Sequence, residues 1–172
     1  MNKEESESVD ELVRAAFEDE ALAYMRYMGF SKQAEDDGYP GIAKVFRTAA
    51  KAEKVHALNQ LAALGWVPPT EDNLEEAVKG ETDECTAFYP KFIETAREEK
   101  RTEVVQSCKW VKEVEETHKK MFEDSLEKIR SEEDVEEKEY YVCMNCGYPE
   151  PGAPPKSCPV CNAPKSVFEK VE

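Results

Sequence analysis

Apolar residues between positions 10 and 130 recur every three to four positions, which is the spacing of one face of an α-helix. Four such stripes follow one another. They comprise Val13, Ala16, Glu20, Ala23, Tyr27, Phe30 and Ala34; Ile42, Val45, Ala49, Glu53, His56, Gln60 and Leu64; Val78, Glu81, Glu84, Phe88 and Phe92; and Val104, Cys108, Val111, Glu115, His118, Phe122, Leu126 and Ile129. Four helices of roughly 25 residues each predict an all-α four-helix bundle over residues 1–130.

Turn and capping residues indicate where these helices end. The sequence DGYPG at 37–41 separates the first two helices, and Gly65 followed by WVPPTEDN indicates the end of the second. Asn73 with Glu76 three residues later resembles a capping box and predicts the start of the third helix. Pro90 lies inside that third helix, so we expect it to bend the helix or to open it locally.

The periodic pattern stops near residue 130. The segment SEEDVEEKE at 131–139 is charged, has little to bury and is typical of a solvated linker. From Tyr140 onward Pro, Gly and Cys dominate, with six Pro between 149 and 164. The last 33 residues, 140–172, are too few to form a hydrophobic core, so we expect a small C-terminal domain that folds around a metal or disulfides.

Charge and hydropathy narrow the range of partners. The chain has 172 residues, and 23 Lys plus Arg against 38 Asp plus Glu give a net charge of −15. Such an acidic surface argues against nucleic acid and anionic membranes as partners, because both require basic residues. No apolar run is long enough to span a membrane. The N-terminal sequence MNKEESESVD is polar and acidic, unlike a signal peptide, so we expect a cytoplasmic protein.

Carboxylates and imidazoles occupy stripe positions where apolar residues belong. Both histidines lie in the same pattern, Glu53-Lys-Val-His56 and Glu115-Glu-Thr-His118, whose spacing puts Glu and His one helical turn apart. The other two helices supply Glu20 and the pair Glu81 and Glu84, so the two halves of the bundle look like copies. One carboxylate plus one Glu-x-x-His from each half is the ligand set of di-iron and di-manganese carboxylate sites.

Electrostatics also favour a metal at this position. Five carboxylates facing one interior would cost several kcal/mol each without partners. Two divalent cations would balance this charge to within one unit. Iron and manganese suit mixed carboxylate and imidazole ligands; zinc also fits but has no redox chemistry. A single Glu-x-x-His could be an ordinary pair of side chains at the edge of a solvated helix face. Carboxylates on all four stripes, with both histidines among them, make such a coincidence a poor explanation.

The remaining cysteines fall into two kinds. Cys143-Met-Asn-Cys146 and Cys158-Pro-Val-Cys161, separated by eleven residues, predict a tetrahedral tetrathiolate metal site. This spacing alone favours zinc, the commoner occupant, whereas a neighbouring redox bundle favours iron. Cys85 and Cys108 stand alone, and we interpret them as small buried apolar residues.

Taken together, the motifs resemble those of the rubrerythrin family over about residues 10–170. The resemblance rests on Ala-Phe-Glu-Asp-Glu20, Arg26-Tyr27, Glu53-Lys-Val-His56, Gly80-Glu81-Thr-Asp-Glu84, Tyr89-Pro-Lys-Phe92, Glu115-Glu-Thr-His118, the knuckles from Cys143 to Cys161, and Asn-Ala-Pro164. It implies a ferritin-like di-iron bundle joined to a small rubredoxin-like Fe(Cys)₄ domain with strands and loops, hence three Fe per chain. Cys85 departs from the aromatic or aliphatic residue of many members.

The resemblance further implies an activity and site roles. The expected activity is that of an oxidoreductase that reduces hydrogen peroxide to water, with electrons from NAD(P)H arriving through partners such as rubredoxin and its reductase. We expect a cytoplasmic homodimer or larger homo-oligomer, in which head-to-tail contacts or swapped helix pairs are both open. The resemblance implies that Glu53 and Glu115 are bridging ligands and that Glu20 and Glu81 are terminal ligands. It implies that His118 binds the second iron, and that Glu84 and His56 exchange as ligands of the first iron. It also implies that Tyr27 and Tyr89 donate hydrogen bonds to the carboxylates.

Three alternatives remain open from the residues. The same bundle site could serve a ferroxidase or an O₂-reducing oxidase, or it could store iron. The third alternative is a zinc-ribbon interaction module on a helical scaffold, in which the Cys-rich tail is colourless. The visible spectrum separates iron from zinc in the tail, and relative turnover with peroxide and O₂ separates the enzymes.

Overall fold

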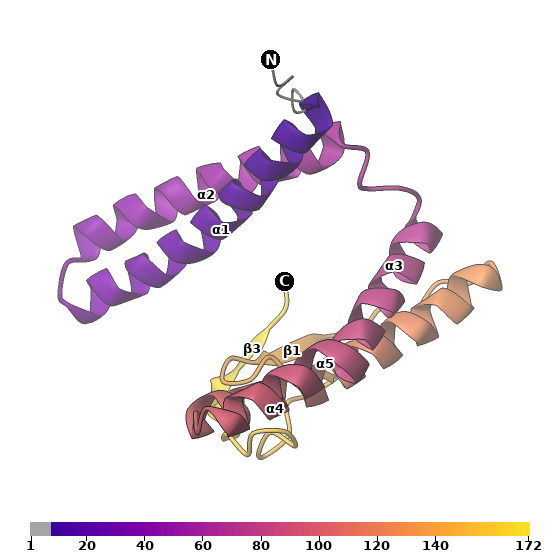
Figure 1. The fold of residues 1–172 in the computed structure, drawn as a ribbon. Helices are drawn as coiled ribbons and strands as arrows, with labels where there is room; N and C mark the ends of the chain where they lie inside the picture. Colours follow the sequence, from indigo (N-terminus) through magenta and orange to yellow (C-terminus); the bar gives the residue numbers. More distant parts are fainter. Residues whose placement is uncertain (1–7) are drawn as a thin grey trace. The chain divides into compact units, whose positions relative to one another are not determined.

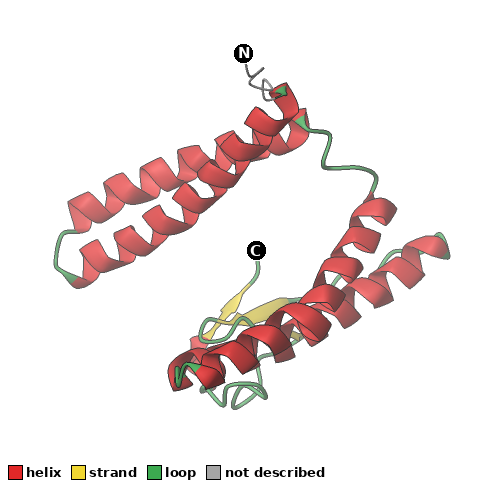
Figure 2. Ribbon diagram, in the orientation of Figure 1, coloured by secondary structure: helices red, strands yellow, loops and turns green. Residues whose placement is uncertain are grey.

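The computed structural model describes residues 8–172, and the chain forms two compact units, Met1–Pro68 and Pro69–Glu172. The first unit contains two helices, and the second contains the remaining helices and a small sheet (Figures 1 and 2). A mostly helical chain with a short C-terminal strand region confirms the predicted fold class. Within residues 8–172, no helix combines the length and apolar character that crossing a bilayer requires. The predicted domain division at 131 and 139 stays a prediction.

In the first unit, α1 (Val9–Asp36) and α2 (Pro40–Ala63) lie side by side (Figure 1). Ser8 and Glu11 form a capping box, with the Ser8 hydroxyl 3.2 Å from the Glu11 amide and the Glu11 carboxylate 2.7 Å from the Ser8 amide. Gly38, with φ +83°, and Pro40 in the first turn of α2 form the turn predicted from DGYPG.

Small residues form the face between α1 and α2. Ser31 and Ala34 of α1 are buried, as are Ala43, Ala50 and Ala57 of α2. The Ser31 hydroxyl donates a 3.0 Å hydrogen bond to the main-chain oxygen of Ala43, which ties the two helices together near their turn. Small side chains allow the two helix backbones to approach closely at these positions, and aromatic rings such as Phe30 and Phe46 pack between the helices beside them.

The second unit begins with α3 (Thr70–Asp83), and its start differs from the prediction. The predicted capping box at Asn73 is wrong, because the helix begins about one turn earlier, directly after Pro69. Glu71 and Asp72 then occupy the first turn, where negative charge is favourable near the helix N-terminus.

A π-helical turn, η1 (Glu84–Phe88), joins α3 to α4 (Tyr89–Glu98). The amide of Tyr89 donates to the carbonyl of Glu84, five residues earlier, which defines the wider turn. Pro90 follows in the first turn of α4, where its missing N–H costs least. The prediction that Pro90 opens the third helix locally is therefore confirmed.

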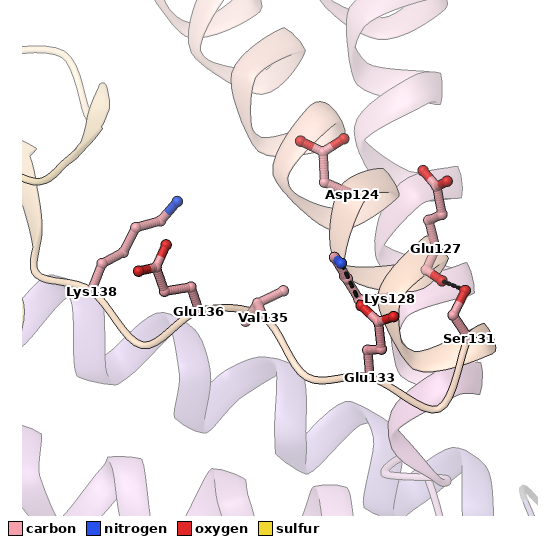
Figure 3. Close-up of a pocket in the computed structure, with 8 residues that line it drawn as sticks. All are labelled: Asp124, Glu127, Lys128, Ser131, Glu133, Val135, Glu136 and Lys138. Carbon is pink, nitrogen blue, oxygen red and sulfur yellow. Dashed lines mark hydrogen bonds and ion pairs between the residues drawn. The ribbon is translucent and has the colours of Figure 1, made fainter.

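The long helix α5 (Thr102–Arg130) packs against α3 and α4 and ends in a closed turn. The amide of Glu133 donates to the carbonyl of Lys128 at 3.0 Å, and Glu132 adopts φ +58°. The acidic segment after α5 folds back here, and its residues line an open pocket with the end of the helix (Figure 3). Lys128 and Glu133 form an ion pair of 2.5 Å across it.

The C-terminal residues form a three-stranded antiparallel sheet in the order β2-β1-β3. β1 (Tyr140–Cys143) lies between β2 (Pro149–Pro151) and β3 (Phe168–Lys170), and a 3₁₀ turn, η2 (Lys165–Val167), precedes β3. β1 ends at Cys143, so the sheet directly positions the first cysteine knuckle. We call residues 140–172 the Cys₄ module.

Candidate metal centres

In the first unit, one carboxylate from α1 meets the Glu-x-x-His of α2. His56 Nδ1 lies 2.9 Å from Glu53 Oε2 and 3.7 Å from Glu20 Oε1. The three side chains each offer a ligand atom within 4.8 Å of the others. Glu53 and His56 project together because three residues on an α-helix are close to one turn.

The second unit repeats this arrangement with α3 and α5. His118 Nδ1 lies 2.6 Å from Glu115 Oε2 and 3.8 Å from Glu81 Oε1. Their ligand atoms also lie within 4.8 Å of one another. The near-identical distances in the two units agree with the duplicated sequence pattern. Each unit therefore carries one carboxylate–imidazole group.

Burial and like charge make the second group unfavourable without a cation. Burial, followed by the hydrogen bond and charge of Glu115, raises the pKa of Glu81 to about 7. Glu81 Oε2 is buried without a hydrogen-bond partner among the described residues. In the first unit, the Glu53 carboxylate likewise raises the pKa of Glu20. Carboxylate oxygens gathered beside imidazole nitrogens are a donor set that iron binds, so these groups fit a di-iron site.

Glu84 and Tyr89 lie close to the second group without joining it, whereas Tyr27 packs among aromatic rings. Burial and the Glu115 charge raise the pKa of Glu84, whereas His118 lowers it, so Glu84 lies within electrostatic range of the second group. Burial and then the Glu84 charge raise the pKa of Tyr89. The Tyr27 ring packs at 6.2 Å from the rings of both Phe30 and Phe46. Hydrogen bonds from the tyrosines to the carboxylates stay predictions.

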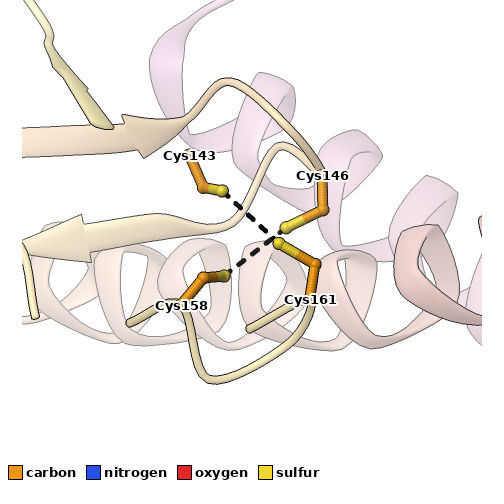
Figure 4. A group of neighbouring side chains, drawn as sticks. All are labelled: Cys143, Cys146, Cys158 and Cys161. Carbon is orange, nitrogen blue, oxygen red and sulfur yellow. Dashed lines mark hydrogen bonds between the residues drawn. The ribbon is translucent and has the colours of Figure 1, made fainter. Parts of the chain in front are cut away.

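The four cysteines of the module converge on one point (Figure 4). Cys143 Sγ lies 3.7 Å from Cys161 Sγ, and Cys146 Sγ lies 3.6 Å from Cys158 Sγ. These distances are far too long for disulfides, but they match the edges of a tetrahedron with metal–sulfur bonds of about 2.3 Å. The group therefore fits a tetrathiolate metal site.

Amide donors surround the sulfur atoms. Burial opposes ionisation of Cys161, yet the Asn145 side chain, the Ala163 amide and the neighbouring thiols lower its pKa to about 7. Burial raises the pKa of Cys146, although the Tyr148 amide acts against it. The sequence did not identify Asn145 as a hydrogen-bond partner of a cysteine. Its position inside the first knuckle was the only hint, because its contact with Cys161 arises only when the loop folds.

The two unassigned cysteines are buried, as predicted. Cys85 is 6% exposed and Cys108 is 8% exposed. The Cys85 thiol lies 3.8 Å from the Lys112 carbonyl of α5, and burial raises its pKa. Both behave as small packing residues of the second unit.

Comparison with known proteins agrees with both kinds of centre. The rubrerythrin family model matches residues 11–126 and 72–144, and the model of the rubredoxin-like domain of rubrerythrin matches residues 141–169. The chain belongs to the rubrerythrin family. The matches span the two carboxylate–imidazole groups and the Cys₄ module, so they cover all three candidate centres.

Individual rubrerythrins align over nearly their whole length. Rubrerythrin-2 of Clostridium acetobutylicum is 30% identical, over 92% of this chain and 94% of the relative. The rubrerythrin of Nitratidesulfovibrio vulgaris is 34% identical over 91% of each chain. A solved structure described as the fully reduced, all-ferrous state of nigerythrin aligns with a TM-score of 0.56 and 27% identity, over 99% of this chain and 90% of that one. The family consists of di-iron oxidoreductases that scavenge peroxide.

Proposed function

We propose that this chain reduces hydrogen peroxide to water at a di-iron site, with electrons drawn from NAD(P)H through the Fe(Cys)₄ site. The observation that carries the proposal is the pair of matching carboxylate–imidazole groups, together with a tetrathiolate site in the same chain. The orphaned oxygen Glu81 Oε2 supports a bound cation, because burying it without one is costly.

The proposed ligand roles follow the pattern of the two groups. Glu53 and Glu115 would serve as the ligands shared by two irons, Glu20 and Glu81 would each serve as a terminal ligand, and His118 would serve as a ligand of the second iron. When bound, the iron pair supplies the two electrons that break the O–O bond of peroxide. The burial of Glu115, with a side chain 14% exposed, supports a central bridging position rather than a solvated one.

Glu84 and His56 are proposed to exchange on the first iron. An anionic carboxylate suits ferric iron, whereas a neutral imidazole suits ferrous iron, so Glu84 would hold the oxidised ion and His56 the reduced one. When it is not a ligand, the Glu84 side chain could carry a proton to the oxygen that departs as water. Tyr89 is proposed to donate its hydroxyl proton in a hydrogen bond to Glu84, and Tyr27 is proposed to do the same for a carboxylate of the first group.

The Cys₄ module is proposed to receive electrons one at a time. Its ligands are Cys143, Cys146, Cys158 and Cys161, and its donors are redox proteins such as rubredoxin with an NAD(P)H-linked reductase. The net charge of −15 supports protein and small-molecule partners over nucleic acid or anionic membranes. The proposal includes a cytoplasmic location and a homodimer or larger homo-oligomer.

Anaerobic reconstitution followed by turnover assays tests this function. We expect three irons per chain, red colour from the Fe(Cys)₄ site, and steady oxidation of NAD(P)H that is faster with peroxide than with O₂. Faster turnover with O₂ would indicate an oxidase or ferroxidase, and many more than three irons per chain would indicate storage. A colourless, zinc-loaded tail would refute the electron-entry role.

A further inference from the structure

Gln60 of α2 is a polar residue at a position where the second unit has an aromatic ring. The two Glu-x-x-His motifs start 62 positions apart, at Glu53 and at Glu115. The same step leads from Gln60 to Phe122, and both side chains are partly buried. An amide in such a place needs hydrogen-bond partners that a phenyl ring does not need. Packing alone therefore does not explain why the repeat has an amide in its first half.

The Gln60 side chain holds an unused hydrogen-bond acceptor. Within residues 8–172, Gln60 Oε1 and Glu81 Oε2 are the two side-chain oxygen or nitrogen atoms that are buried without a hydrogen-bond partner. Glu81 belongs to the carboxylate–imidazole group of the second unit, whereas Gln60 belongs to neither group. Burying an amide oxygen without a donor is costly, so an orphaned acceptor in a folded protein indicates a partner in another state of the molecule.

His56 carries a suitable donor one helical turn away. It precedes Gln60 by four residues, a spacing at which side chains meet on one face of a helix. His56 Nδ1 lies 2.9 Å from Glu53 Oε2 and 3.7 Å from Glu20 Oε1, so Nδ1 is the nitrogen beside the carboxylates. An imidazole that binds a metal through Nδ1 keeps its proton on Nε2, on the other side of the ring. That N–H requires an acceptor outside the carboxylate group.

The His56 ring also depends more on such a hydrogen bond than its counterpart does. In its own unit the His56 side chain is 53% exposed, whereas that of His118 is 32% exposed. Packing fixes an exposed ring only weakly, so a hydrogen bond to its second nitrogen decides how the ring is held. Phe122, four residues after His118, offers no acceptor. The two halves thus differ at the residue that follows each histidine by one turn.

We propose that Gln60 is a positioning residue for His56, whose Nε2–H it accepts through Oε1 when Nδ1 holds an iron ion. This inference rests on the ligand role of His56 in the proposed function. The hydrogen bond orients the ring and strengthens Nδ1 as a ligand, because an acceptor at one ring nitrogen raises the basicity of the other. Gln60 thereby favours the state in which His56 is a ligand, which is the ferrous state in the proposed exchange.

Anaerobic titration with Fe²⁺ tests this role without any turnover. The Fe(Cys)₄ site of the full-length protein is filled first, and further binding of Fe²⁺ is measured against a competing chelator. Gln60→Leu removes the acceptor at similar volume, so we expect the Fe²⁺ affinity to fall about tenfold. Gln60→Glu keeps an acceptor oxygen and should retain most of the affinity. Gln106→Leu, the same change at an exposed glutamine of α5, is the control. Wild-type affinity in Gln60→Leu would overturn the inference.

A double variant separates positioning of His56 from packing of α2. If Gln60 acts through His56, adding Gln60→Leu to His56→Ala should lower the Fe²⁺ affinity no further. Metal-free Gln60→Leu should be at least as stable as wild type in urea unfolding, because the change removes an orphaned buried oxygen. Additive losses of affinity, a less stable metal-free variant, or an unchanged affinity in His56→Ala would each overturn the inference. None of these measurements uses peroxide, so a wild-type protein without peroxide turnover would refute the proposed function and leave this test decisive.

Discussion

Replacement of Glu81 with Gln should stabilise the metal-free protein and weaken the metal-loaded one. In the metal-free chain the pKa of Glu81 is about 7 instead of 4.5, because the carboxylate is buried beside Glu115. That difference corresponds to about 3 kcal/mol against the ionised form. The Glu81 side chain is 18% exposed, so solvent screens part of this and we expect roughly 2 kcal/mol to be measurable. Gln has the shape of the protonated acid and carries no charge.

The pH dependence gives the effect its sign. Between pH 4.5 and 7 the folded chain holds the Glu81 proton and the unfolded chain loses it. The contribution of Glu81 to the stability of the metal-free protein is therefore fully present below pH 4.5 and is lost as the pH rises through 7. The stability gained by Glu81→Gln should be largest above pH 7 and should vanish near pH 4.

Urea unfolding of metal-free protein, followed by helical circular dichroism, measures this difference at pH 4, 6 and 8. Glu76→Gln is the matched control, since Glu76 is an exposed glutamate on the same helix α3. Iron titration of the same variants should show weaker binding only for Glu81→Gln. A Glu81→Gln variant that is less stable than wild type at pH 8, or equally stabilised at all pH values, would refute the reasoning.

Three further predictions address other parts of the molecule. Cys158→Ser should abolish the red colour and leave two irons per chain, as measured by metal analysis and visible spectra; loss of all three would contradict separate sites. Glu84→Ala should raise and His56→Ala should lower the di-iron reduction potential, each by roughly tens of millivolts in potentiometry; shifts of equal sign would exclude ligand exchange. Ala50→Leu should overpack the α1–α2 face and cost about 1–3 kcal/mol in urea unfolding, whereas the same change at exposed Ala62 should cost little.

The helices and the residues of each group could be predicted because their signals are local. A 3.6-residue period reveals α1, α2 and α5, and a Glu-x-x-His spacing fixes two side chains on one turn without knowledge of the tertiary structure. The Cys-x-x-Cys knuckles are equally local, and their sulfur atoms converge as expected. The metal-ligand roles of these residues stay predictions.

Features that depend on contacts between distant residues could not be predicted. The start of α3 at Thr70 overrides the capping pattern at Asn73, because Pro69 and the acidic residues after it already provide a favourable first turn. A Cβ placed on Gly147 would lie 3.8 Å from Val114 Cγ1, so segments 33 residues apart meet here without a periodic trace in the sequence. A glycine after a knuckle predicts a tight turn, but only the fold shows which helix lies beside that turn.

The π turn at Glu84–Phe88, which directly precedes the turn that contains Pro90, changes the geometry of a candidate site. Pro90 has no N–H, so the carbonyl of Thr86 cannot receive the usual α-helical bond from it. In an uninterrupted α-helix, Glu84 and Tyr89 would be about 140° apart around the axis, because five residues rotate by about 500°. The π turn instead bonds the Tyr89 amide to the Glu84 carbonyl, which brings the two residues onto one face. The charge of Glu84 accordingly raises the pKa of Tyr89, and only burial raises that pKa more. A strictly α-helical interpretation of the stripe would separate these residues, so their proximity depends on the π turn rather than on the spacing of the carboxylates.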